Sequence, residues 1–199
     1  LIAADKLSET GKAFPELASF DELMCSFVKE NEIPGAALAV AKDGRLVYAR
    51  GFGYANRKKK EPVQPESLFR IASISKPLTA VATLQLVEQG KLKLDDSVFD
   101  ILQHKAHLPN GRKVDPRLKD ITLAHLMRHQ GDWHRDKSID PLFHSIEIAT
   151  ALGKRPPATH NDIIRFMKGW PLDFKPGTRY AYSNLGYCLL GRVIEQATG

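Results

Sequence analysis

The sequence predicts an α+β fold, in which an antiparallel hairpin is followed by a mostly helical region. Residues 16–31 have the apolar spacing of an amphipathic helix. Residues 35–41 and 45–53 are predicted to be two strands joined through Lys42-Asp43-Gly44, because an Asp-Gly pair favours a tight hairpin. Only helical segments are predicted beyond residue 75, and this order of elements is typical of α+β proteins.

The remaining elements follow from local signals. Residues 1–15 have no periodicity and are expected to form an extended arm, and Ser67–Ile71 are predicted to form a short strand. A helix is predicted from Ser75 to Gln89, with Gly90 as its C-terminal stop. Three further helices carry capping signals: 97–102 after Asp95 or Asp96, 122–129 with Thr122, and 161–168 with Thr159 and Asp162.

A serine and a lysine lie three residues apart where one of these helices begins, in Phe69-Arg70-Ile71-Ala72-Ser73-Ile74-Ser75-Lys76. Positions i and i+3 share a helix face, so the Ser73 hydroxyl and the Lys76 amine can converge as nucleophile and base. Free backbone N–H groups at a helix start can also stabilise an oxyanion. The alternative is that Ser73 is an N-cap, which is the more frequent role of a serine at such a position.

The S-x-x-K pattern alone is weak evidence, because it occurs twice in the chain. Its other copy, Ser26 to Lys29, lies in the middle of the helix predicted over 16–31. The backbone N–H of Ser26 is then bonded within that helix, and we interpret this copy as structural.

A Tyr-x-Asn motif also occurs twice. Tyr54-Ala55-Asn56 leads into a basic turn after a strand. Tyr182-Ser183-Asn184 instead follows the Pro176-Gly177 loop and ends where a helix begins. In this second copy Asn184 can cap the helix and the Tyr182 phenol can project into a cleft.

Further segments share the pattern of one family: Ile33-Pro34-Gly35-Ala36-Ala37-Leu38-Ala39-Val40, Gly51-Phe52-Gly53-Tyr54-Ala55, Gly90-Lys91-Leu92-Lys93-Leu94-Asp95-Asp96, and Ile121-Thr122-Leu123-Ala124-His125-Leu126-Met127-Arg128-His129. With the two motifs, they resemble the penicillin-recognising serine hydrolases, and within them the class C β-lactamase-like branch. That branch also holds D-alanyl-D-alanine carboxypeptidases, aminopeptidases and carboxylesterases. The resemblance covers roughly residues 30 to 199 in the family's order.

The resemblance implies a β-lactamase-like fold, with an antiparallel sheet flanked by helices plus an all-helical region. Residues 1–72 would be the N-terminal part of the sheet domain, and residues 73–199 would be the mostly helical domain. The implied activity is that of a serine hydrolase acting through a covalent acyl-enzyme on amide, β-lactam or ester substrates. The alternative is a catalytically silent binding or regulatory module on the same fold.

The resemblance also implies roles for single residues and needs no cofactor. Ser73 would be the nucleophile, Lys76 would take its proton, and Tyr182 would relay protons to the leaving group and later activate water. Asn184 would bind the substrate amide or hold Lys76. The expected partner is a small-molecule or peptide substrate.

The sequence departs from the family in two places. Relatives carry His-Thr-Ser-Gly where this chain has His129-Gln130-Gly131-Asp132-Trp133, and a stretch over about 131–158 follows that we expect to line or cover the cleft. The C-terminal strands and helix of the family, with a Lys-Thr-Gly or His-x-Gly motif, have no counterpart. We therefore expect a piece of a longer protein, or a second chain that completes the sheet, and weak or no activity from these residues alone.

Composition narrows the remaining function classes. The chain is 43% hydrophobic and 26% charged, as in soluble globular proteins, and it has no apolar run of the roughly 20 residues that a membrane span needs. The formal charge is +6, but the basic residues are scattered, and the cluster Arg57–Lys60 lacks interleaved aromatics, which argues against nucleic-acid binding. Cys25 and Cys188 are expected to be reduced packing residues. The family suggests a periplasmic or secreted protein, and residues 1–5 could follow a removed leader.

A metal site is the last alternative. His125 and His129 are spaced i and i+4, and Asp132, His134 and Asp136 follow closely. No glutamate stands in a zincin arrangement, and the resemblance accounts for both histidines as structural, so we predict no metal. Trp133 and Trp170 are predicted to be packing residues.

Overall fold

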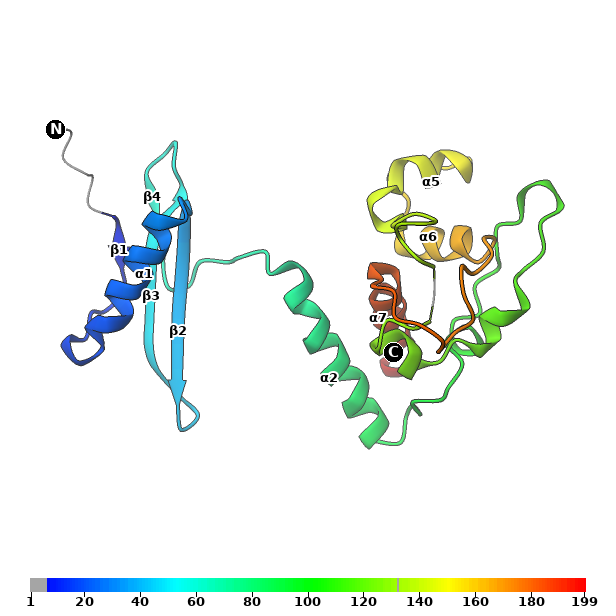
Figure 1. Ribbon diagram of the computed structural model, residues 1–199, viewed down its shortest axis with the longest axis horizontal. Helices are drawn as coiled ribbons and strands as arrows, with labels where there is room; N and C mark the ends of the chain where they lie inside the picture. The colour runs from blue at the N-terminus through cyan, green and yellow to red at the C-terminus, as the bar shows by residue number, and fades with distance from the viewer. Residues whose placement is uncertain (1–6, 132) are drawn as a thin grey trace. The chain divides into compact units, whose positions relative to one another are not determined.

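The computed structural model describes residues 7–131 and 133–199 and divides the chain into two compact units. One unit extends to Arg70 and contains a small sheet, and the other, Ile71–Gly199, is helical (Figure 1). Each unit has a hydrophobic core of its own.

The sheet unit is organised around a long antiparallel hairpin. β2 (Gly35–Lys42) pairs with β3 (Arg45–Asn56), with a register shift between Val40 and Ala41. The turn residues Asp43 and Gly44 have φ of 51° and 73°. Positive φ at both positions is what a two-residue turn of the favoured hairpin type needs. The predicted hairpin is confirmed.

Two very short strands complete this sheet. β1 (Glu9–Thr10) and β4 (Glu61–Pro62) both pair antiparallel with β3, which gives the order β1-β3-β2 with β4 beside β3. The arm expected over residues 1–15 is extended at β1, and the sequence did not predict that it pairs with β3 there. The strand predicted at Ser67–Ile71 is wrong, because these residues pair with no strand in the described part of the chain.

One helix covers a face of the hairpin (Figure 1). It is α1 (Ala18–Glu30), preceded by the 3-10 turn η1 (Pro15–Leu17), and it confirms the helix predicted over 16–31. The core beneath it is formed by three buried side chains: Val28, Tyr48 and Phe52.

The helical unit is assembled around α7, which packs against α2, α3 and α4. Its buried face carries Leu185, Leu189, Leu190 and Val193. The described helices of this unit are α2 (Ser75–Glu88), α3 (Val98–Ile101), α4 (Leu123–Met127), α5 (Ser145–Ala151), α6 (His160–Met167) and α7 (Asn184–Thr198). The 3-10 turns are η2 (Ala72–Ile74), η3 (Pro109–Gly111), η4 (Pro116–Asp120) and η5 (Pro141–Phe143).

Most of the predicted helix starts agree with the structure. The capping boxes of α4 and α6 are both present: Thr122 with His125, and Thr159 with Asp162. The prediction that Asp95 or Asp96 caps α3 is wrong, because its N-cap is Ser97. The Asp96 carboxylate instead accepts the Lys93 N–H at 2.7 Å and closes the preceding turn.

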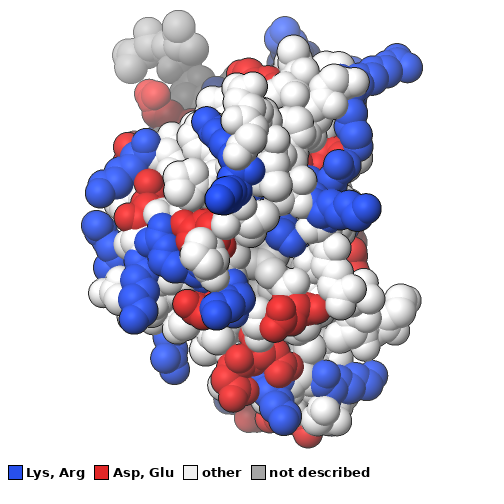
Figure 2. Space-filling model, turned by 90° about the vertical axis from the view of Figure 1, so that its right-hand side faces the viewer, with Lys and Arg blue, Asp and Glu red and all other residues white. Residues whose placement is uncertain are grey.

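Acidic and basic side chains are interspersed on one face of the molecule (Figure 2). On the face drawn in Figure 2, basic side chains form several separate groups with acidic side chains between them. A nucleic-acid-binding face is usually a continuous basic patch or stripe. Within the described residues, every helix is too short or too polar to cross a bilayer.

Candidate active site

Ser73 lies in the single turn η2, which directly precedes α2. The residue before it, Ala72, has a left-handed φ of 45°. That conformation costs a non-glycine residue about 1–3 kcal/mol and is concentrated at functional sites. Ser73 is exposed to solvent and stands at the start of a helix, as the sequence predicts.

The serine hydroxyl contacts two groups that can carry its proton. Ser73 Oγ accepts a hydrogen bond from Lys76 Nζ at 3.1 Å. The same oxygen lies 2.7 Å from Tyr182 Oη, far along the chain. The structure therefore brings Ser73, Lys76 and Tyr182 to one point on the surface of the helical unit.

Asn184 joins this group through its side chain. Its Oδ1 accepts a hydrogen bond from Lys76 Nζ at 2.7 Å. The expectation that Asn184 caps α7 is wrong, because the N-cap is Ser183, whose hydroxyl accepts the Gly186 N–H at 3.0 Å. With Ser183 as the cap, the amide of Asn184 is available for contacts in the site.

The segment that carries Tyr182 is fixed along the C-terminal end of α4. The His129 backbone carbonyl accepts the Ala181 N–H at 2.8 Å, and the His129 side-chain Nδ1 accepts the Ser183 N–H at 3.1 Å. The His129 ring also stacks on the Tyr182 ring, with centroids 4.6 Å apart. His129 therefore holds both sides of Tyr182 and fixes the direction of the phenol.

The preceding Pro-Gly loop docks on the same region. Gly177 donates its N–H to the Gln130 carbonyl at 2.8 Å and has a φ of 79°. A Cβ at this position would lie 2.8 Å from His125 Nε2, so only glycine fits both the conformation and the space.

The electrostatics of the site lower the pKa of the Tyr182 phenol. The pKa of Tyr182 is lowered mainly by polar interactions with Lys76 and Ser73, and further by the positive charges of Lys76 and Arg135. Burial opposes this shift but does not cancel it. Burial and the nearby Lys76 lower the pKa of His129, so this histidine stays neutral and keeps Nδ1 as an acceptor.

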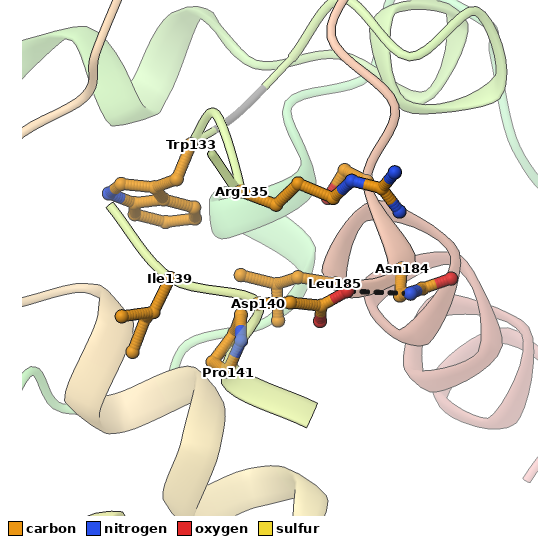
Figure 3. Close-up of a pocket in the computed structure, with 8 residues that line it drawn as sticks. Trp133, Arg135, Ile139, Asp140, Pro141, Asn184 and Leu185 are labelled. Carbon is orange, nitrogen blue, oxygen red and sulfur yellow. Dashed lines mark hydrogen bonds between the residues drawn. The ribbon is translucent and has the colours of Figure 1, made fainter. Parts of the chain in front are cut away.

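Part of the stretch over 131–158 lies beside these groups. Trp133, Arg135 and Asp140 line a small crevice together with Asn184 (Figure 3). The Arg135 guanidinium lies 5.1 Å from the centre of the Tyr182 ring. The sequence predicted that this stretch would line the cleft, but it did not single out Arg135 or Asp140.

Both residues lacked a local signal. Asp140 precedes Pro141 at the start of η5, where an aspartate is an ordinary candidate for a helix cap. Its side chain makes no capping hydrogen bond there. The role of Trp133 was predictable, since it is a packing residue with 3% exposure whose Nε1 donates to the Trp170 carbonyl at 3.2 Å.

The histidine pair has other partners. His125 Nδ1 accepts the Thr122 N–H at 3.3 Å, and His129 Nδ1 holds Ser183. Across residues 7–131 and 133–199, no group of three or more His, Cys, Asp or Glu could hold a metal ion. Asp132, which the metal alternative included, lies outside the described residues.

Comparison with known proteins identifies the family of this chain. A family model described as Beta-lactamase matches residues 20–199. Esterase EstB from Burkholderia gladioli is 33% identical over 190 residues, which cover 92% of this chain and 45% of EstB. The octameric penicillin-binding protein homologue from Pyrococcus abyssi is 32% identical with a TM-score of 0.67, over 92% of this chain and 40% of that chain.

A class C β-lactamase in complex with cefoxitin shares the fold, with a TM-score of 0.66 at 23% identity over 92% of this chain and 45% of that one. The chain thus spans less than half the length of each of these proteins. The match nevertheless includes both units and every residue of the site described above. This chain belongs to the Beta-lactamase family.

Proposed function

We propose that the protein carrying this chain is a serine hydrolase that works through an acyl-enzyme on Ser73. One observation carries the proposal: Ser73 Oγ lies within hydrogen-bond distance of both Lys76 Nζ, at 3.1 Å, and Tyr182 Oη, at 2.7 Å. A nucleophile beside a proton acceptor, at a helix start that offers backbone N–H groups, is the arrangement that acyl transfer needs.

In the acylation step, Ser73 Oγ attacks the carbonyl carbon of an amide, β-lactam or ester. The hydroxyl proton passes to Lys76, and a tetrahedral intermediate forms with its oxyanion near the Ser73 N–H. When the bond to the leaving group breaks, Tyr182 gives that group a proton. Tyr182 and Lys76 contact the same serine oxygen, so a proton can move between them without a large rearrangement.

Deacylation repeats the sequence with water as the nucleophile. The Tyr182 phenolate removes a proton from water, which attacks the acyl carbon. When the bond to Ser73 breaks, Lys76 returns its proton to Ser73 Oγ, and the serine leaves as a hydroxyl. The lowered pKa of Tyr182 supports this role, because it makes the phenolate available nearer neutral pH. Asn184 keeps Lys76 in place during both steps.

The proposal is for the complete protein. An oxyanion hole uses two donors, of which the Ser73 N–H is one. We expect the second donor and further strands from residues beyond this chain or from another chain, because the chain spans less than half the length of its relatives. These 199 residues alone are accordingly expected to react slowly or not at all.

Covalent labelling tests the proposal. A fluorescent fluorophosphonate and a fluorescent penicillin should label the intact protein, and mass spectrometry should place the adduct on Ser73. Ser73→Ala should abolish labelling, and the matched control Ser26→Ala should leave it unchanged. Absence of any adduct on Ser73 with both probes would instead support a silent binding or regulatory module.

A substrate panel then separates the members of the class. Turnover of a p-nitrophenyl ester, a chromogenic cephalosporin and a D-Ala-D-Ala peptide should be compared on the same preparation. Each activity should be lost together in Ser73→Ala, and the substrate with the highest kcat/KM identifies the favoured acyl donor.

A further inference from the structure

The Asn184 amide is held between two charged side chains. On one side its Oδ1 accepts from Lys76 Nζ at 2.7 Å. On the other side its Nδ2 donates to Asp140 Oδ2, also at 2.7 Å, as Figure 3 shows. Asp140 thus stands at the end of a hydrogen-bonded series that continues through Asn184 and Lys76 to Ser73.

The chemistry of these groups permits one orientation of the amide. A carboxylate only accepts hydrogen bonds, so it must face the NH₂ end of Asn184. The carbonyl end then faces Lys76, whose nitrogen donates to it. An amide group in place of Asp140 could accept or donate. It would allow Asn184 to turn its NH₂ group towards Lys76 whenever the lysine nitrogen has the free lone pair that it needs to act as a base.

The segment that carries Asp140 is fixed in place. The Asp173 carboxylate accepts both the His134 N–H at 2.7 Å and the Ser138 hydroxyl at 2.6 Å. On the other side of Asp140, Pro141 is buried at the start of η5. Asp140 is therefore held by anchors that precede and follow it, and its carboxylate is a rigid partner for Asn184.

Folding stability gives little reason for a carboxylate at this position. Its second oxygen, Oδ1, is buried, and no donor within the described residues reaches it. A buried acceptor without a donor costs about 1–3 kcal/mol, and more when the group is charged. An asparagine at this position would avoid a charged group with an unpaired buried oxygen, so a requirement for Asp140 should come from the site and not from the fold.

We propose that Asp140 is a positioning residue that sets the orientation of the Asn184 amide and, through it, the placement of Lys76 against Ser73. The inference rests on the proposed function. It adds a residue from the stretch over 131–158 to the series of groups that act on the nucleophile.

The test uses Asp140→Asn in the intact protein and the kinetics of fluorophosphonate labelling at Ser73. We expect the limiting rate constant of labelling to fall about 10²-fold, because misplacement of a reacting group by about 1 Å costs that much. The binding constant of the probe should change less than about twofold, because Asp140 does not contact the probe and affects only the bond-forming step. The melting temperature should stay equal or rise, because the variant removes a half-buried carboxylate whose Oδ1 has no donor within the described residues.

Two further variants separate positioning from a structural effect. Glu147→Gln is the matched control, because it neutralises an exposed carboxylate in the same stretch and should leave labelling unchanged. In an Asn184→Ala background, Asp140→Asn should have almost no additional effect, since Asp140 acts through the amide that is already absent.

The outcomes are distinct. If the wild-type protein labels Ser73 and Asp140→Asn labels it equally fast, the inference is wrong and the proposed function stands. Additive effects of Asp140→Asn and Asn184→Ala would also overturn the inference. If the wild-type protein forms no adduct on Ser73, the proposed function itself fails.

Discussion

The same tetrapeptide pattern occurs in both units with different surroundings. Ser26 and Lys29 are exposed on α1, and within the described residues neither side chain has a hydrogen-bond partner. Ser73 and Lys76 lie at the start of α2, where they bond to one another and to groups from the start of α7. The difference between the two copies lies in the partners that the fold supplies.

The second motif repeats this contrast. Tyr54 and Asn56 end β3, where the Asn56 side chain accepts the Lys59 N–H at 3.1 Å and closes an exposed turn. Tyr182 and Asn184 instead reach Ser73 and Lys76. A short pattern therefore predicts function only when a second pattern is expected to meet it in space.

Replacing the lysine should separate the two S-x-x-K copies most strongly. Lys76→Met keeps the length of the side chain and removes the proton acceptor, so we expect labelling at Ser73 to slow by about 10³-fold. Lys29→Met should leave the labelling rate unchanged and cost about 0.3–1 kcal/mol at most, as the loss of a cation near a helix C-terminus. The measurement is the second-order rate constant of fluorophosphonate labelling. Equal rates in wild type and Lys76→Met would show that Lys76 is not the base.

Removing one phenol should have the next largest effect. Tyr182→Phe keeps the stack on His129 and deletes the hydroxyl that contacts Ser73 Oγ, so kcat for ester turnover should fall about 10²-fold with little change in folding stability. Tyr54→Phe is the control and should retain wild-type turnover. If the two variants had equal activity, a proton relay through Tyr182 would be refuted.

The sequence was sufficient where a signal is local. The i, i+3 spacing of Ser73 and Lys76, the Asp43-Gly44 turn, the Thr122 cap and the capping box of Thr159 and Asp162 all depend on neighbours within a few residues. The structure has each of these features at the predicted place.

The sequence was insufficient where contacts join distant segments. The contact of Asp140 with Asn184 and that of Arg135 with Tyr182 depend on how an irregular stretch folds back onto α7. β1 was missed for a related reason, because two residues cannot show periodicity and pair only once β3 is in place. Resemblance did not supply these residues either, since it implied no role for any residue of this stretch.

A smaller effect should follow from removing a charge near the phenol. Arg135→Gln takes away one of the positive charges that lower the pKa of Tyr182, so that pKa should rise. If deacylation depends on the phenolate, its rate should then fall at neutral pH. The acidic limb of its pH profile should move to higher pH. The pH profile of deacylation measures this shift.

Arg179→Gln is the matched control for this experiment. The Arg179 guanidinium lies over the Phe174 ring, at 5.6 Å from its centre, and it does not contribute to the shift at Tyr182. The profile of Arg179→Gln should coincide with that of the wild type. A downward shift of the limb in Arg135→Gln would contradict the assignment of the charge effect.

The smallest effect should come from the second copy of the Tyr-x-Asn motif. Asn56→Ala removes one side-chain hydrogen bond to the Lys59 N–H and should cost about 0.5–1.5 kcal/mol of stability, because that amide is exposed and can bond to water instead. Hydrogen exchange at the Lys59 amide should accelerate, and labelling at Ser73 should keep its wild-type rate. If Asn56→Ala slowed labelling by more than about twofold, the two copies would not be independent, and the contrast between a structural and a catalytic motif would have to be abandoned.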